Sequence, residues 1–224
     1  MTDQSEMRDI AAGRAQTYAI LAALYSAPPS TELTALIRAG GLRQEGNSAL
    51  AAAANALTDA FAADVPETDI VAEHTRLFVL PSGVVPHESN YLDENRRIGG
   101  HVTVAVQRFY DSAAAQFTKE CLELADHIGV ELAFMRFLCD LEAQFWQSDN
   151  EEGLNKCLAF QSEFLHNHLL PWQRTLCEKV LEETGLDLYR ALACLTLEFL
   201  ESERRHVPES NTLSERRLTC ETQS

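Results

Sequence analysis

Apolar residues recur every three or four positions along most of this chain, and this spacing constrains the fold more than any other feature. Such a spacing places the apolar side chains on one face of an α-helix. In residues 5–25, Tyr18, Leu21 and Tyr25 share a face, and residues 126–148 carry a wide apolar face in the same way. No internal repeat is present to indicate a solenoid. The pattern predicts an all-α protein.

Capping residues, prolines and glycines mark where the expected helices begin and end. We expect helices at about 5–25, 31–39, 48–62, 67–79, 101–113, 126–148, 151–170, 171–185 and 188–203. The expected N-caps are Ser30, Asn47, Asp126, Asp149 or Asn150, and Asp187, and Pro171 suits the first turn of a new helix. The fold class predicted is a single globular multi-helix domain of nine or ten helices.

Residues 101–110 begin with an alternation that is typical of a strand. However, Val102, Val106, Phe109 and Tyr110 also form a helical face, and the sequence offers no partner strand nearby. We therefore interpret this segment as a helix. The domain is expected to span residues 1–205, and the polar tail of residues 206–224 is expected to be disordered.

The chain is acidic, with a formal net charge of −16. From position 201 onward, five acidic and four arginine residues nearly cancel, so the preceding 200 residues carry −15. A body of this charge repels nucleic acid and anionic lipid, so neither is an expected partner. It attracts a basic partner, although acidity also serves solubility, and composition alone leaves both interpretations open.

The sequence contains no run of about 18 apolar residues that a membrane span needs. Its N-terminus, MTDQSEMRDI, lacks the apolar region of a signal peptide. The six cysteines form no CxxC pair, which argues against a zinc site. We expect a cytoplasmic protein with free thiols, no stable membrane insertion, and no metal or other cofactor.

Residues 81–100, PSGVVPHESNYLDENRRIGG, form a loop that is long for a compact domain. Glu88 supplies a carboxylate, Ser89 a hydroxyl and Tyr91 an amphipathic ring. These groups suit a peptide that carries basic residues beside apolar ones. A connecting segment with solvated charges is the local alternative.

Asp126 and His127 are adjacent at the start of a predicted helix. The pair suggests acid–base chemistry, but neighbouring residues on a helix point in different directions, and the position of Asp126 suits an N-cap. The chain has no HExxH, GxSxG or P-loop motif, so the usual metal, hydrolase and nucleotide signatures are absent.

Four segments, taken in order, resemble the TorD/DmsD family of molybdoenzyme maturation chaperones, which is related to the NarJ chaperones. They are RLFVLPSGVVPHESNYLDE, DHIGVELAFMRFL, HLLPW and YRALACLTLEFL, and they lie between about 75 and 200. Two positions depart from the family pattern. Position 87 is His where many members have an aromatic residue, and position 125 is Ala where many have Pro.

The resemblance implies a non-enzymatic cytoplasmic chaperone for a molybdopterin-containing oxidoreductase. Such a chaperone binds the twin-arginine signal peptide of the catalytic subunit and assists cofactor loading and folding before export. The residues implied to bind the peptide are Pro86, Glu88, Ser89, Tyr91, Asp126 and His127. Leu77, Phe78 and the HLLPW segment are expected to support the binding cleft.

Three alternatives remain at this point. Asp126 and His127 could serve a small hydrolase-like enzyme, although no third catalytic group is evident in the sequence. The chain could instead deliver the molybdenum cofactor directly, or be a structural helical subunit. It could act as a monomer or as a helix-swapped dimer.

Overall fold

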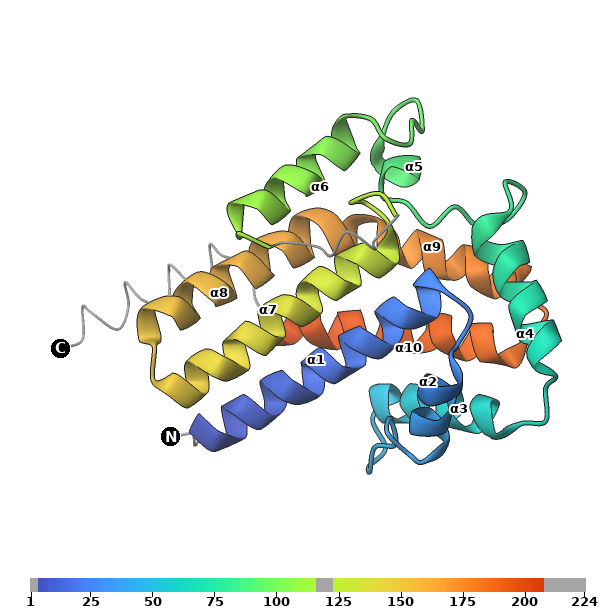
Figure 1. Ribbon diagram of the computed structural model, residues 1–224, viewed down its shortest axis with the longest axis horizontal. Helices are drawn as coiled ribbons and strands as arrows, with labels where there is room; N and C mark the ends of the chain where they lie inside the picture. Colours follow the sequence, from blue (N-terminus) through green and yellow to red (C-terminus); the bar gives the residue numbers. More distant parts are fainter. Residues whose placement is uncertain (1–3, 116–122, 208–224) are drawn as a thin grey trace.

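The computed structural model describes residues 4–115 and 123–207. Its elements are α1 (Gln4–Ser26), α2 (Thr31–Arg38), α3 (Ala49–Ala62), α4 (Glu67–His74), the π-helical turn η1 (Thr75–Val79), α5 (Ser89–Leu92), α6 (His101–Ser112), α7 (Ile128–Ser148), α8 (Glu151–Phe164), the π-helical turn η2 (Leu165–Leu169), α9 (Leu170–Glu183) and α10 (Asp187–His206) (Figure 1). The described residues contain these helices and one isolated β-bridge, so the predicted all-α class is confirmed.

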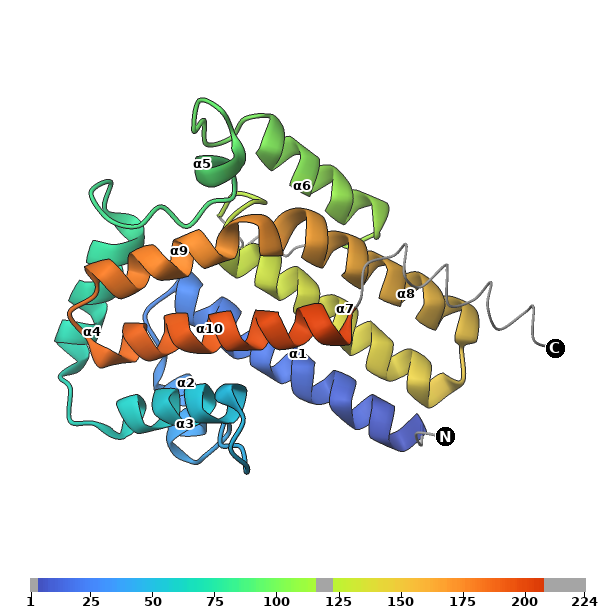
Figure 2. The ribbon, with the colours of Figure 1, turned by 180° about the vertical axis from the view of Figure 1, so that it is seen from behind.

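The longest helices pack against one another in pairs. Helix α1 runs antiparallel to α7 over most of its length (Figure 1). Viewed from behind, α10 lies between α9 and α3 (Figure 2). None of the described helices is long and apolar enough to cross a membrane.

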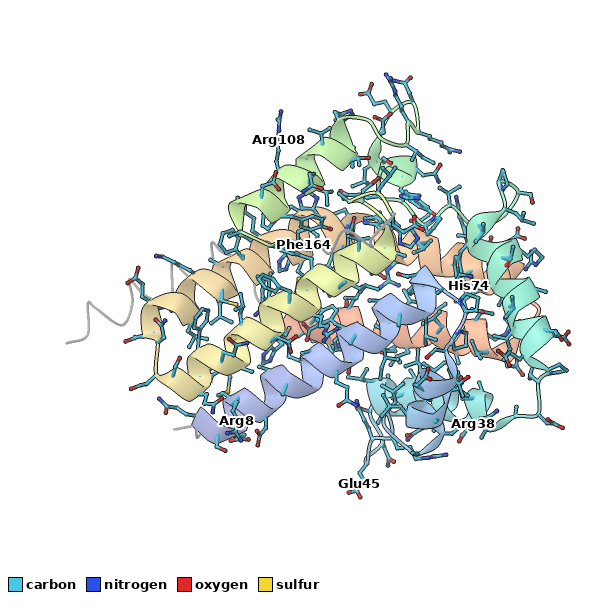
Figure 3. The ribbon with its side chains drawn as sticks, viewed as in Figure 1. Arg8, Arg38, Glu45, His74, Arg108 and Phe164 are labelled. Atoms are coloured by element: carbon cyan, nitrogen blue, oxygen red, sulfur yellow. The ribbon has the colours of Figure 1, made fainter. Side chains whose placement is uncertain are left out.

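Helix α6 covers one side of this bundle through aromatic side chains. The ring centroids of Phe109 and Phe164 lie 5.3 Å apart, and those of Tyr110 and Phe134 lie 4.6 Å apart. Phe164 points into the bundle, whereas Arg108 projects away from it (Figure 3). The helical interpretation of residues 101–110 is therefore confirmed, because the apolar face of the segment packs on α7 and α8 rather than on a strand.

Helices α8 and α9 are continuous through η2, whereas the sequence predicted a new helix starting at Pro171. Proline has no amide hydrogen to donate and its ring crowds the preceding turn. The wider turn of η2 relieves this crowding, since the amide of Leu170 donates to the carbonyl of Leu165, five residues earlier. Pro171 follows at once and falls in the first turn of α9, where no donor is needed.

The predicted caps Ser30 and Asn150 are confirmed, because each accepts a hydrogen bond from the amide three residues later. Two other predictions were wrong. Ser48, not Asn47, caps α3 and accepts from the Ala51 amide at 3.0 Å. Asp187 lies inside the first turn of α10, where its charge complements the helix dipole without capping.

A buried charged group, which we call the Arg14 cluster, joins α1, α7, α8 and α10. The Arg14 guanidinium donates to Glu203 at 2.7 and 2.8 Å, to Glu142 at 2.6 Å and to Gln161 at 2.7 Å. Tyr18 Oη donates to Glu203 at 2.9 Å. Burial acts to lower the pKa of Arg14, but the two carboxylates outweigh it and raise that pKa. The cluster therefore holds a permanent cation.

Helix α10 continues through His206, one residue past the expected end of the domain, and Val207 is buried behind it. The remainder of the expected tail, residues 208–224, lies outside the described residues.

Candidate functional site

The loop of residues 81–100 is joined to the start of α7 by main-chain hydrogen bonds. The Glu88 amide donates to the Asp126 carbonyl, and the Ile128 amide donates to the Pro86 carbonyl, each at 2.9 Å. His87 and His127 form an isolated antiparallel bridge between the two segments. Two stretches about 40 positions apart in the sequence thus form one unit.

The start of the loop turns back closely on η1. The Val84 amide donates to the Leu77 carbonyl at 2.6 Å. A Cβ atom at Gly83 would overlap the carbonyl oxygens of Arg76 and Leu77, so this turn requires glycine. The first half of the loop is therefore held against both η1 and the start of α7.

Tyr91 fixes the middle of the loop. Its hydroxyl donates to the Val85 carbonyl at 2.9 Å, and its ring stacks on Trp172 with centroids 5.2 Å apart. Lys179 Nζ lies 4.9 Å from the centre of the same ring, which is a cation–π distance. Tyr91 as a whole is half-buried.

Asp126 does not cap α7, so this prediction was wrong. Its Oδ2 accepts from the Ser89 amide at 3.1 Å, so the carboxylate lies at the first turn of α5 on the opposite segment. His127 takes the capping position, and its Nδ1 accepts from the Gly129 amide at 3.0 Å. The Asp126 carboxylate is therefore bound by an amide of the loop rather than by an amide of its own helix.

The charge states of these two neighbours follow from their surroundings. Burial acts to raise the pKa of Asp126, but the His87 ring and Ser89 outweigh it and bring that pKa to about 2. Burial, followed by the nearby His87, lowers the pKa of His127 to about 3. At neutral pH Asp126 is thus ionised, and His127 is a neutral hydrogen-bond acceptor for a backbone amide.

Glu88 is buried and faces a histidine from a distant helix. His168 Nδ1 lies 3.2 and 3.3 Å from the two oxygens of the Glu88 carboxylate. Only 2% of Glu88 is exposed. The contact connects the loop to η2.

Glu131 is a third buried carboxyl group at the same place, and the sequence analysis missed it. It is fully buried, and its Oε2 accepts from Trp172 Nε1 at 3.2 Å. Burial raises the pKa of Glu131 well above its usual value, and the Glu88 and Asp126 carboxyl groups raise it further. We call Glu88, Asp126 and Glu131 the acid cluster.

A signal for Glu131 was present in the sequence. It lies three residues after Ile128 and four before Met135, both of which are buried, so it falls on the apolar face of α7. In the first turn of a helix, however, a glutamate is also expected as a partner of the helix dipole. His168 and Trp172 carry a similar signal, because a spacing of four places both on one helix face.

The predicted site residues Pro86, Glu88, Ser89, Asp126 and His127 are therefore close together but buried, and Tyr91 is half-buried. The outer surface of the loop has a hollow of about 570 Å³, which Leu92, Asp93, Glu94, Asn95, Arg97, Gly100 and His101 line. Large apolar side chains are exposed along the same loop and at its start, namely Val79, Leu80, Leu92 and Ile98. The acid cluster is buried, and none of its three carboxyl groups lines this hollow.

Within residues 4–115 and 123–207, no group of three His, Cys, Asp or Glu side chains converges as ligands of a metal ion do.

Comparisons with known proteins relate the chain to a family of maturation factors. The family model described as the nitrate reductase delta subunit matches residues 43–178. Chaperone protein TorD of Vibrio cholerae (strain M66-2) is 25% identical over 191 residues, which cover 84% of this chain and 83% of that protein. In another V. cholerae strain, the TorD match covers 64% of each chain.

A protein named as the Tat proofreading chaperone DmsD of Haemophilus influenzae is 27% identical over 137 residues, 60% of each chain. The chain thus spans less than two thirds of the length of two of these three relatives. Among solved structures, one described as a redox enzyme maturation protein from Archaeoglobus fulgidus is 16% identical, with a TM-score of 0.47, and the match covers 83% of this chain and 92% of that one.

Proposed function

The chain belongs to the family of the nitrate reductase delta subunit and the TorD and DmsD chaperones, and on this premise we propose that it is a maturation chaperone for a molybdopterin-containing oxidoreductase. It binds the twin-arginine signal peptide of the catalytic subunit in the cytoplasm. It keeps that subunit from export until the cofactor is loaded and the subunit has folded.

The acid cluster is the observation that carries this proposal. An arginine side chain presents a planar fork of donors that matches carboxylate oxygens. The cluster offers three carboxyl groups in a space from which water is excluded, where charge-assisted hydrogen bonds are strong. The net charge of −16 adds a long-range attraction for a cationic segment.

The surface around the cluster suits the remainder of such a peptide. A signal peptide continues from its basic residues into an apolar stretch. Val79, Leu80, Leu92 and Ile98 are exposed beside the loop and supply apolar contacts for that stretch. The peptide therefore meets acidic groups and apolar groups on neighbouring parts of one surface.

Each predicted site residue has a role in this proposal. Glu88 and Asp126 bind the two guanidinium groups, Tyr91 and His127 shape the cleft, and Pro86 and Ser89 hold the loop in position. Because the two carboxylates are buried, binding includes a displacement of the loop from the start of α7. The two main-chain hydrogen bonds at that junction are few enough to break and re-form.

Titration of the chain with a twin-arginine peptide and its Lys-Lys variant tests the proposal. A lysine ammonium is a point charge and cannot form the bidentate contact, so we expect the arginine peptide to bind roughly tenfold or more tightly. Glu88→Gln and Asp126→Asn keep the shape of the side chains and should remove this preference. Glu94→Gln, an exposed change on the same loop, is the matched control.

Two results would contradict the proposal. The first is equal binding of both peptides by the wild-type chain. The second is an undiminished arginine preference in Glu88→Gln and Asp126→Asn, which would assign the peptide to another surface. Binding should also weaken as salt is added, because the attraction between the acidic body and the peptide is screened.

A non-enzymatic role agrees with the positions of Asp126 and His127. His127 Nδ1 is occupied by the Gly129 amide and Asp126 Oδ2 by the Ser89 amide, so each side chain has a structural partner in place of the other. A hydrolytic role for this pair predicts turnover that is lost in His127→Asn, and a cofactor-delivery role predicts a pterin or nucleotide retained on the purified chain.

A further inference from the structure

The acid cluster lacks a permanent cation. Within residues 4–115 and 123–207, no lysine or arginine forms an ion pair with Glu88, Asp126 or Glu131. The basic groups that approach are imidazoles, with His168 against Glu88 and His87 Nδ1 3.7 Å from Asp126 Oδ1. Three adjacent carboxyl groups without a fixed cation cannot all remain ionised at low cost when water is excluded.

Two oxygens of the cluster have no hydrogen-bond donor. Glu131 Oε1 and Asp126 Oδ1 are both buried, and no donor among the described residues is in range of either. Buried polar atoms are nearly always paired in native proteins, so each such atom calls for an explanation. For Glu131 the neighbouring group is the Glu88 carboxyl, and two carboxyl groups form a hydrogen bond only when one of them carries a proton.

We propose that Glu88 and Glu131 share one proton in the unliganded protein, and that an arginine side chain of the client replaces it. The proposal rests on the proposed function, because it concerns the same site and the same ligand. On binding, the O–H bond of the shared acid breaks, the proton leaves to solvent, and the guanidinium enters with its own positive charge. The charge of the cluster is the same before and after the exchange.

The groups that face Glu131 agree with this exchange. Burial is the largest influence on its pKa and raises it, and Glu88 from the start of α5 and Asp126 from the α7 junction add to this increase. Trp172 from α9 donates to the other oxygen and opposes the increase only in part. Glu131 is thus protonated when the cluster is closed and becomes a carboxylate when a guanidinium pairs with it.

The exchange makes peptide binding depend on pH. Since one proton leaves for each peptide that binds, the affinity should increase by up to roughly tenfold for each unit by which the pH is raised, as long as the pH stays below the pKa of the shared proton. The Arg14 cluster shows a site in which the cation is present, because its two carboxylates receive three guanidinium hydrogen bonds within 2.8 Å. Glu142 and Glu203 therefore need no shared proton to balance their charge.

Calorimetric titration of the full chain with the twin-arginine peptide tests the exchange directly. Measured in two buffers with different heats of ionisation, the wild-type chain should release about one proton for each peptide bound. Glu131→Gln keeps an acceptor for Trp172 and a permanent donor for Glu88, and it should bind without releasing a proton. The exposed Glu163→Gln variant is the control and should behave as wild type.

Binding that releases no proton from the wild-type chain would overturn the inference while leaving the proposed function standing. Proton release that persists unchanged in Glu131→Gln would also overturn it, because the proton would then come from another group.

A measurement without peptide separates the two proposals. Infrared difference spectra at neutral pH should show the carbonyl band of a protonated carboxylic acid in the wild-type chain and not in Glu131→Gln. If this band is missing from the wild-type chain, the inference is wrong whatever the peptide does. If the band is present and the peptide does not bind, the proposed function and the exchange by arginine both fail.

Discussion

The Arg14 cluster and the acid cluster lie in one helical bundle, and α7 contributes a buried glutamate to each, Glu142 to the first and Glu131 to the second. The two groups differ in what balances their charge. Glu142 faces a guanidinium from α1, whereas Glu131 faces two further carboxyl groups and a tryptophan. One cluster is complete within the chain, and the other has room for a cation from outside.

The difference separates a structural role from a binding role. A buried ion pair with all its hydrogen bonds formed fixes the relative positions of the helices that contribute to it. A buried acid group without a permanent cation does not fix the positions of helices in this way. The acid cluster instead lies where the loop of residues 81–100 meets the start of α7. The comparison therefore assigns stability to the Arg14 cluster and ligand exchange to the acid cluster.

The largest expected effect comes from removing the cation of the complete cluster. Arg14→Met leaves Glu142 and Glu203 buried without a cation, and we expect the free energy of unfolding to fall by about 3–5 kcal/mol. Denaturant titration measures this. Arg8→Met changes an exposed arginine on the same helix and should have little effect. A loss in Arg14→Met well below this value would mean that the Arg14 cluster does not stabilise the fold.

A matched pair of substitutions on α7 compares the clusters directly. Glu142→Gln removes the charge that Arg14 pairs with, and should lower the free energy of unfolding by about 2 kcal/mol. Glu131→Gln replaces a neutral acid by a neutral amide, and at neutral pH should change it by less than about 1 kcal/mol. Equal losses in the two variants would mean that Glu131 is ionised in the folded chain.

The pH dependence of stability tests the neutral state of His127. Its pKa is about 3 in the folded chain against a usual 6.5, so between these values the unfolded chain binds a proton that the folded chain does not. Stability is therefore lost as the pH falls from 6.5 towards 3, and at pH 5 the loss is about 2 kcal/mol.

His127→Asn retains a capping side chain without this proton site. The loss of unfolding free energy between pH 7 and pH 5 should be smaller by about 2 kcal/mol in this variant than in the wild-type chain. Glu131 acts in the opposite direction in both proteins, because its raised pKa lowers stability as the pH rises, so the difference between them isolates His127. Parallel pH profiles would show that His127 does not carry this dependence.

The smallest expected effect concerns the two tryptophans that donate to the two glutamates of α7. Trp172→Phe removes the donor to Glu131, and should lower the free energy of unfolding by about 1 kcal/mol and raise the pKa of Glu131 further. Trp146→Phe removes a longer contact of 3.4 Å to Glu142 and should cost less, because Arg14 still satisfies that carboxylate. A larger loss of unfolding free energy in Trp146→Phe than in Trp172→Phe would contradict this ranking.

Much of the fold could be predicted from local pattern. The spacing of apolar residues gave the helices and most of their boundaries, because helical periodicity is a property of neighbours in sequence. At Asn47 the error was one position, because the neighbouring Ser48 takes the capping role. At Asp187 the helix starts one residue earlier than expected and has no side-chain cap. At Asp126 the carboxylate instead accepts from the Ser89 amide of another segment, which a local pattern does not contain.

The candidate site was predicted in part. Glu88, Tyr91 and Asp126 were named because they lie in segments with an unusual composition or a family likeness. Glu131 was missed, and His168 was named only within the HLLPW segment that was expected to support the cleft, because each acquires its role from a contact with a distant residue.

The sequence by itself determined that this chain is an acidic, all-helical protein with a polar loop between helices, because those properties depend on composition and on neighbours within a few positions. Only the tertiary structure decided which buried carboxylates are paired. Arg14 meets Glu203 across 189 positions, His168 meets Glu88 across 80, and Trp172 meets Glu131 across 41. Burial and pairing over such separations depend on how the helices pack, and the charge of a buried carboxyl group depends on both.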